Sequence, residues 1–161
     1  MPAGRPIIAI SKRFILLACL GATMAAGADR RIVDRVTIGD PRSEREHAYA
    51  GDSVIAGVSD GRTFRQARGW MRYALTVFDD TEVSISCSFL GNGDAPQTFD
   101  LMVENQVVGS YTFRSAQPTT VEFRVPLAIT RGHTNILVVL RATNGPTPPL
   151  VELRSVQDHN E

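Results

Sequence analysis

Apolar and polar residues alternate with a period of two through most of this chain, and this alternation restricts the possible fold more than any other feature. In the segment 83–89, Val83, Ile85, Cys87 and Phe89 alternate with three serines. Successive side chains of a β-strand point to opposite faces, so the pattern predicts a strand with one buried face. No stretch of useful length shows the 3.6-residue period of an amphipathic helix. The sequence therefore predicts an all-β protein.

Seven further segments carry the same alternation or an unbroken apolar run. They are 31–38, 53–58, 70–78, 99–104, 121–125, 136–140 and 150–156. The segment 136–140 contains only apolar residues, which predicts a central strand covered on both faces. The residues from 156 onward are expected to fray, as chain ends often do.

Turn-forming residues separate these segments at short intervals. Examples are Asp60-Gly61, Arg131-Gly132 and Asn144-Gly145-Pro146. Gly and Asn accept positive φ, and Pro cannot donate to a sheet ladder, so such residues end strands. Many short strands joined by turns predict two packed antiparallel sheets, in a β-sandwich or jelly roll.

The first 28 residues have the pattern of a signal peptide. Lys12 and Arg13 precede a stretch of apolar or small residues that reaches Ala26, and the Ala-Gly-Ala at 26–28 fits a cleavage site before Asp29. A retained membrane anchor and a core helix are the alternatives. Removal is favoured because the stretch is short for a bilayer span and no second apolar run follows it.

A lipoprotein signal at Cys19 is a weaker alternative, because most of the apolar stretch follows that cysteine. The expected organisation is thus a signal peptide at 1–28 and a single β-sandwich domain at 29–161. The expected location is secreted or periplasmic, in a bacterium, with no transmembrane segment after signal removal. The processed chain would carry 14 basic and 17 acidic residues, a formal charge of −3 without a basic patch. Nucleic acid is therefore not expected as a partner.

The residues that usually carry chemistry are sparse. The sequence has no Gly-rich phosphate loop and no nucleophile elbow, and its three histidines lie far apart. Cys87 lies on the apolar face of its strand, so we expect a buried core residue rather than a reactive thiol. No catalytic residue, metal ligand or cofactor is predicted. Asp40, Glu44 or Asp52 could hold a structural Ca²⁺, but their spacing does not require one.

Two polar segments, 40–47 and 60–70, are richer in functional side chains than turns need to be. Arginine guanidiniums bond to vicinal hydroxyls, and an exposed indole stacks on a sugar ring. The arginines there have no obvious acidic partner in the alternating pattern, and Trp70 lies opposite the apolar face of its strand. The predicted ligand-binding residues are His47, Arg62, Arg65 and Trp70. The alternative is a solvated loop with the Trp packed over a sheet edge.

Four stretches, taken in order, resemble a known bacterial domain. They are Asp34-x-Val36-x-x-Gly39-Asp40-x-x-Ser43-Glu44-x-x-His47, Gly61-Arg62-x-Phe64-Arg65-x-Ala67-x-Gly69-Trp70-x-x-Tyr73, Phe99-Asp100-Leu101-x-Val103 and Glu152-Leu153-Arg154-Ser155-Val156. They are similar to the C-terminal β-sandwich of β-L-arabinofuranosidases in glycoside hydrolase families 127 and 146. The resemblance implies a non-catalytic domain described as substrate-binding. The catalytic carboxylate, zinc and cysteine of those enzymes lie in a helical barrel that has no counterpart here.

Residues and resemblance together predict an exported, non-catalytic carbohydrate-binding module. Its expected partner is an arabinose-containing or related glycan, with a glycoside hydrolase as a second partner. The alternative is a structural or protein-docking β-sandwich without sugar affinity. An enzyme with an unrecognised site is the third hypothesis.

Overall fold

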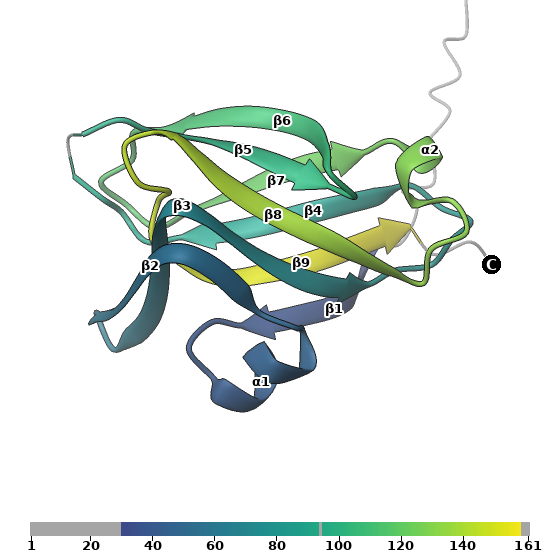
Figure 1. Ribbon diagram of the computed structural model, residues 1–161, viewed down its shortest axis with the longest axis horizontal. Helices are drawn as coiled ribbons and strands as arrows, with labels where there is room; N and C mark the ends of the chain where they lie inside the picture. Colours follow the sequence, from purple (N-terminus) through teal and green to yellow (C-terminus); the bar gives the residue numbers. More distant parts are fainter. Residues whose placement is uncertain (1–29, 94, 159–161) are drawn as a thin grey trace, which may run out of the picture.

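The computed structural model describes residues 30–93 and 95–158, and these residues form nine β-strands and two short helices. All eight predicted strand segments lie within or overlap these strands. The signal peptide predicted at 1–28 lies outside the described residues. The elements, shown in Figure 1, are β1 (Arg30–Thr37), α1 (Pro41–Glu46), β2 (Ala50–Ser59), β3 (Arg62–Thr76), β4 (Val83–Phe89), β5 (Gln97–Val103), β6 (Gln106–Phe113), β7 (Thr119–Val125), α2 (Leu127–Thr130), β8 (Asn135–Asn144) and β9 (Leu150–Asp158).

The strands form two layers that pack face to face. The five-strand layer has the order β6-β5-β8-β3-β2, and the four-strand layer has the order β7-β4-β9-β1. Every strand pair is antiparallel. One residue pair, Arg65 opposite Leu150, links β3 to β9 and so connects the two layers. In Figure 1, β5, β6 and β8 lie over β4 and β7. The predicted antiparallel sandwich of the jelly-roll type is confirmed.

The hydrophobic core fills the space between the two layers. In β3, Met71, Tyr73 and Leu75 are fully buried, whereas Trp70 is half-buried on the opposite face of the strand. Cys87 of β4 has no exposed surface, which confirms that it is a core residue. Burial raises the pKa of the Cys87 thiol, because the apolar surroundings disfavour the thiolate. This cysteine is therefore a poor nucleophile.

Two tight turns form β-hairpins, and the first of them, at Asp60-Gly61, was predicted as a turn from the sequence. Asp60 and Gly61 join β2 to β3 with φ values of 50° and 72°. Glu104 and Asn105 join β5 to β6 with φ values of 48° and 64°. Positive φ at both central residues is the geometry of a type I′ turn, whose twist matches that of the flanking strands. Both hairpins therefore follow from turn chemistry.

Three details of the predicted strands are wrong. β8 is covered on one face only, and Leu137 is 38% exposed because the other face of β8 is the outside of the sandwich. β3 begins at Arg62 rather than Trp70, since the polar segment continues the ladder with β2. β9 extends to Asp158, where β1 pairs with it, so the chain does not fray at residue 156.

Candidate functional site

α1 is a capped turn of helix fixed to the edge of the four-strand layer. The Asp40 carboxylate accepts hydrogen bonds from the backbone N–H groups of Arg42 and Ser43, at 2.8 and 3.1 Å. The Ser43 hydroxyl in turn accepts the backbone N–H of Thr37 on β1, at 3.0 Å. These bonds hold α1 so that Glu44 faces inward. No helix in the described part of the chain is long and apolar enough to span a membrane.

Arg65 is engaged inside the protein. Its Nε and Nη2 donate to the two carboxylate oxygens of Glu44, at 2.5 and 2.7 Å, and Glu44 is only 6% exposed. The guanidinium carbon lies 4.4 Å from the centre of the Tyr49 ring, a cation–π distance. The bonds to Glu44 raise the pKa of Arg65 above its ordinary value. The acidic partner that the sequence pattern did not reveal is thus supplied by α1.

His47 also makes internal contacts. Its Nδ1 lies 2.6 Å from the Ser43 carbonyl oxygen, and its Nε2 lies 3.1 Å from Oδ1 of Asp34. Asp34 further accepts the backbone N–H groups of Thr76 and Arg35, at 2.7 and 2.8 Å. Burial by itself would raise the pKa of Asp34, but these hydrogen bonds outweigh it and hold the pKa below its ordinary value. The His47–Asp34 contact therefore ties α1 to the strands β1 and β3.

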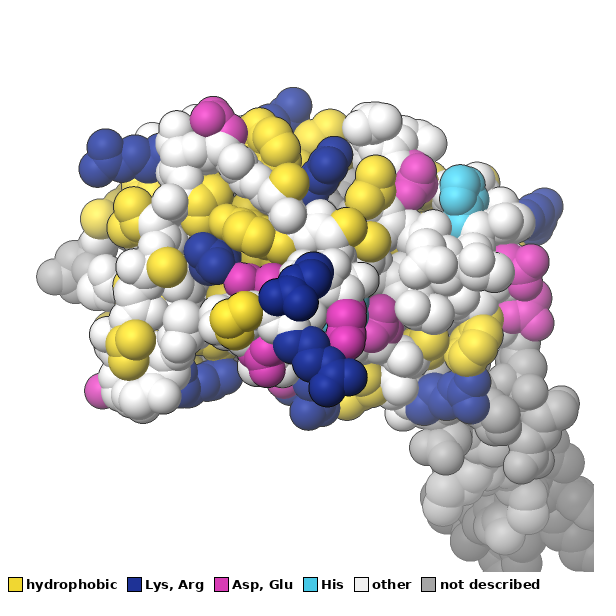
Figure 2. Space-filling view, turned by 60° about the horizontal axis from the view of Figure 1, so that its bottom comes forward, with side chains coloured by type: hydrophobic (Ala, Val, Ile, Leu, Met, Phe, Trp, Pro, Cys, Tyr) yellow, Lys and Arg dark blue, Asp and Glu magenta, His cyan; other side chains and the backbone are white. Residues whose placement is uncertain are grey.

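Arg62 is exposed beside a shallow groove between the β1–α1 connection and the β2–β3 turn. The groove has a volume of about 530 Å³ and is lined by Thr37, Ile38, Gly39, Asp40, Pro41, Gly61, Arg62, Thr63, Val151 and Glu152. Arg62 makes no ion pair within residues 30–93 and 95–158, so its guanidinium remains available to a ligand. Acidic and basic side chains are mixed over the surface around α1 (Figure 2).

Trp70 lies in a row of polar side chains that crosses the outer surface of the five-strand layer. In the strand register, Asp52 is opposite Trp70, Trp70 is opposite Arg141, Arg141 is opposite Asp100, and Asp100 is opposite Ser110. Directly opposed residues have Cβ atoms about 4.5–5.5 Å apart, so their side chains are neighbours. We refer to these five residues as the Trp70 row.

Hydrogen bonds order the middle of the Trp70 row. Nη2 of Arg141 donates to Oδ2 of Asp100 at 2.7 Å, and the Ser110 hydroxyl donates to Oδ1 at 2.5 Å. The bond from Ser110, followed by that from Arg141, holds the pKa of Asp100 below its ordinary value. Asp100 therefore remains a carboxylate at neutral pH and fixes the position of Arg141 beside Trp70.

An apolar row lies next to the Trp70 row. Val139 of β8 is opposite Met102 of β5, and Met102 is opposite Val107 of β6. Val107 is 52% exposed, and the other two side chains are half-buried. Arg72 occupies the β3 position of this row, with its guanidinium carbon 5.9 Å from the Trp70 ring centre. The surface thus offers an aromatic ring, apolar contacts and paired charges side by side.

The four sequence-predicted residues do not form one cluster of contacts. No hydrogen bond, ion pair or ring contact joins any two of them among the described residues. α1 connects His47 and Arg65 indirectly, through Glu44. Arg62 lines the groove at the hairpin end, and Trp70 belongs to the outer surface. Sequence reasoning did not single out Asp100 and Arg141 as binding residues, although the outward position of Asp100 in its alternating strand was visible.

The acidic residues considered for Ca²⁺ have other partners. Asp40 caps α1 and Glu44 pairs with Arg65. Asp52 packs closely against Gly69: a side-chain Cβ at position 69 would lie only 2.7 Å from Oδ2 of Asp52. Within residues 30–93 and 95–158, no group of three or more His, Cys, Asp or Glu side chains is arranged to hold a metal ion.

Comparison with known proteins places this chain in a family. Residues 28–156 match DUF6805, a family of unknown function. The chain belongs to DUF6805. No curated protein matches it. The resemblance to arabinofuranosidase domains of families 127 and 146 therefore remains a prediction, although the match covers the same part of the chain.

Solved structures with the same fold include carbohydrate-binding modules. A family 35 module from Clostridium thermocellum has a TM-score of 0.56 at 12% identity, covering 80% of the DUF6805 chain and 98% of the module. A family 35 module from an environmental isolate has a TM-score of 0.59 at 12% identity, with 79% and 98% covered. Part of a family GH115 4-O-methyl-α-glucuronidase with specificity for decorated arabinogalactans is also similar. Its TM-score is 0.57 at 12% identity, over 83% of the DUF6805 chain and 18% of the enzyme.

Proposed function

We propose that this chain is an exported, non-catalytic carbohydrate-binding module that binds an arabinose-containing or related glycan. The observation that carries the proposal is the Trp70 row beside an apolar row on one outer surface. A sugar ring has an apolar face and a rim of hydroxyls, so it needs both kinds of contact within one patch. The fold neighbours, two of which are carbohydrate-binding modules, support the same function.

The proposed contacts divide between stacking and hydrogen bonding. The Trp70 indole stacks on the ring, and the guanidinium of Arg141, ordered by Asp100, donates to hydroxyls. Each new hydrogen bond contributes about 0.5–1.5 kcal/mol net, and stacking adds a similar amount. After the entropic cost of association, a few such contacts correspond to a Kd on the order of 0.1–1 mM.

The sequence-predicted residues take different roles in this proposal. Trp70 contacts the sugar, and Arg62 offers a second contact point at the groove beside the β2–β3 turn. His47 and Arg65 fix α1 to the sheets, and thereby hold Asp40 and Pro41 in the lining of the Arg62 groove. The buried Cys87 has no assigned role in binding, since burial raises its pKa and makes it a poor nucleophile.

We further propose that the module acts with a glycoside hydrolase. In the GH115 enzyme, a domain of this fold forms part of a chain with specificity for decorated arabinogalactans. The resemblance to the accessory domain of β-L-arabinofuranosidases points to the same class of partner. A module that binds a glycan near such an enzyme raises the local concentration of its substrate.

Affinity electrophoresis in gels that contain arabinan, arabinogalactan or arabinoxylan tests the proposed function. Wild-type protein should be retarded by at least one polymer, and Trp70→Ala should abolish the retardation without lowering the Tm. Phe78→Ala is the matched control, since Phe78 is also a partly exposed aromatic residue but lies outside the Trp70 row. The same gels test the Arg62 groove: Arg62→Ala should reduce the retardation, whereas the control Arg131→Ala should leave it unchanged. Absence of binding to any of these glycans at millimolar concentration would reject the proposed function.

Docking to a protein is the second candidate, and the edge of β2 favours it. β2 pairs with β3 alone among the described strands, so its other edge is open. Ile55 and Val58 on this strand are 56% and 71% exposed. Asp52 is the only charged residue of β2, and a largely uncharged open edge invites pairing with another strand. If this candidate holds, Val58→Lys should abolish co-purification with a hydrolase partner while Trp70→Ala leaves it intact.

A further inference from the structure

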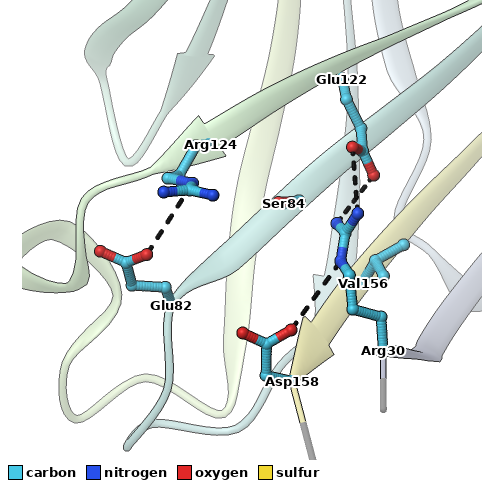
Figure 3. A pocket seen from close by; sticks show the side chains of 7 residues that line it. All are labelled: Arg30, Glu82, Ser84, Glu122, Arg124, Val156 and Asp158. Carbon is cyan, nitrogen blue, oxygen red and sulfur yellow. Dashed lines mark hydrogen bonds and ion pairs between the residues drawn. The ribbon is translucent and has the colours of Figure 1, made fainter. Parts of the chain in front are cut away.

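A second groove lies on the outer surface of the four-strand layer (Figure 3), and none of its lining residues belongs to the Trp70 row. Its volume is about 520 Å³, within the range of small-ligand sites. It is lined by Arg30, Glu82, Ser84, Glu122, Arg124, Val156 and Asp158. These residues come from β1, β4, β7 and β9 and from the residue before β4.

The groove exists because short side chains lie between long ones. Ser84, Ser86 and Ser88 of β4 lie on the side away from the core, because the alternate positions of this strand point into the core, although Ser86 is itself buried. In the register, Ser84 lies between Arg124 of β7 and Val156 of β9. A serine between longer residues on both sides leaves a trough whose floor is a hydroxyl group.

Ion pairs form the two walls of this trough. On one side, Nη2 and Nη1 of Arg30 donate to the Glu122 carboxylate at 2.8 and 3.3 Å, and Nε lies 3.8 Å from Asp158. On the other side, Nε of Arg124 lies 3.9 Å from Glu82. Figure 3 shows Ser84 between the two pairs, with the charged ends of the side chains facing the space above it.

The chemistry of the lining selects a class of ligand. Three carboxylates and two guanidiniums line the groove, and each guanidinium is paired with a carboxylate, so hydrogen-bond acceptors and donors lie next to one another. An anion would face an excess of carboxylates, and an apolar ligand would remove five charged groups from water without offering them new hydrogen bonds. Neutral vicinal hydroxyls donate and accept at once and match this lining.

We propose that this groove is a second binding site for neutral sugar hydroxyls, so that one chain bridges two glycan segments. The inference rests on the proposed function, because it extends the same ligand class to the opposite surface. The two sites lie on the outer faces of two sheets that pack about 10 Å apart, so occupation of one leaves the other open. A module with two such faces links neighbouring polysaccharide chains.

Binding stoichiometry with a short arabinan-derived oligosaccharide, arabinotriose, tests the bridge. By isothermal titration, wild type should bind with two sites per chain, and Trp70→Ala and Ser84→Tyr should each retain one. The tyrosine fills the groove and suits a strand. Ser88→Tyr is the matched control, since Ser88 has the same strand and face but lies outside the groove lining. Glu122→Gln, which removes a wall charge without adding volume, should weaken the second site at least tenfold.

Light scattering with soluble arabinan gives an independent readout. Wild type and Ser88→Tyr should cross-link the polymer and raise the scattering, while either single-site variant binds without cross-linking. Sedimentation should show the same oligomeric state for all variants. Single-site binding by wild type that Trp70→Ala abolishes and Ser84→Tyr leaves unchanged would overturn the bridge and retain the proposed function. Absence of any binding by wild type would overturn both.

Discussion

Glu44 and Arg65 form an ion pair whose carboxylate is almost fully buried, with only 7% of its side chain exposed. A buried charge is tolerated only when it is paired and hydrogen-bonded. Besides Arg65, the Glu44 carboxylate accepts the backbone N–H of Gly39, at 3.0 Å. The pair therefore joins α1, the connection before it and β3 into one unit.

Replacing Arg65 should therefore lower stability. We expect Arg65→Ala to cost about 3 kcal/mol of unfolding free energy, the low end for breaking a buried pair, because the guanidinium itself is partly exposed. The double variant Arg65→Ala, Glu44→Gln should recover part of the loss, since it removes the unpaired charge. Urea denaturation measures both effects. Unchanged stability together with lost glycan retardation would instead show that Arg65 contacts the sugar directly.

Asp34 should make stability sensitive to acid. Its folded-state pKa lies below the ordinary value of 3.8, so as pH falls the unfolded chain takes up the proton first. The stabilisation is complete above that ordinary value and is lost as pH falls through the folded-state pKa. We expect the Tm of wild type to fall more steeply than that of Asp34→Asn below about pH 4. Equal slopes for the two proteins would contradict this role, and Asp60→Asn in the exposed hairpin turn serves as the control.

Single residues differ in how far the sequence could predict them. The burial of Cys87 followed from alternation, which is a local property. The partner of Arg65 could not be predicted in this way, because Glu44 is 21 positions away and reaches it only after α1 folds back. The Arg141–Asp100 pair spans 41 positions and depends on the register of β8 with β5.

Among the elements, α1 depends most directly on its cap. We expect Asp40→Ala to destabilise the protein by about 1 kcal/mol, because two backbone N–H groups lose their acceptor. Hydrogen exchange should accelerate in the amides of α1 while those of β4 remain protected. Asp79→Ala in an exposed turn is the matched control. Uniformly faster exchange across both elements would indicate a global effect and contradict the assignment of a local cap.

The strand pattern explains which elements could be predicted. Strands with one buried face, such as β4, β5 and β7, show clear alternation. β6 was missed because it lies at the edge of its layer and only Phe113 is buried, so its sequence has no apolar face to recognise. The composition of α1 indicates only a polar segment, although Asp40 followed by Pro41 is a typical helix start.

At the scale of the molecule, the strand order could not be derived from alternation alone. Alternation identifies strands and their buried faces, but the same faces could pair in many orders. The chain places β9, the last strand, between β1 and β4, and β8 between β3 and β5. Both proposed sites depend on this order, since the Trp70 row crosses five strands and the serine-floored groove is lined from four. Strand alternation indicates which polar residues point outward, but it does not indicate which strands bring them together into a site.

The first strand of the described residues begins close to the predicted processing site. β1 starts at Arg30, and the DUF6805 match starts at residue 28. Cleavage after Ala28 would leave Asp29 as the new N-terminus and keep Arg30, which forms a wall of the second groove.

Expression of the full chain in a bacterial host should therefore yield an exported protein whose intact mass corresponds to residues 29–161. A variant with Ala26→Arg and Ala28→Arg should accumulate unprocessed, because signal peptidase requires small residues at these two positions. An intact mass that corresponds to a chain starting at Cys19 with an attached lipid would establish the lipoprotein alternative. An unprocessed wild-type protein would establish a retained N-terminal segment.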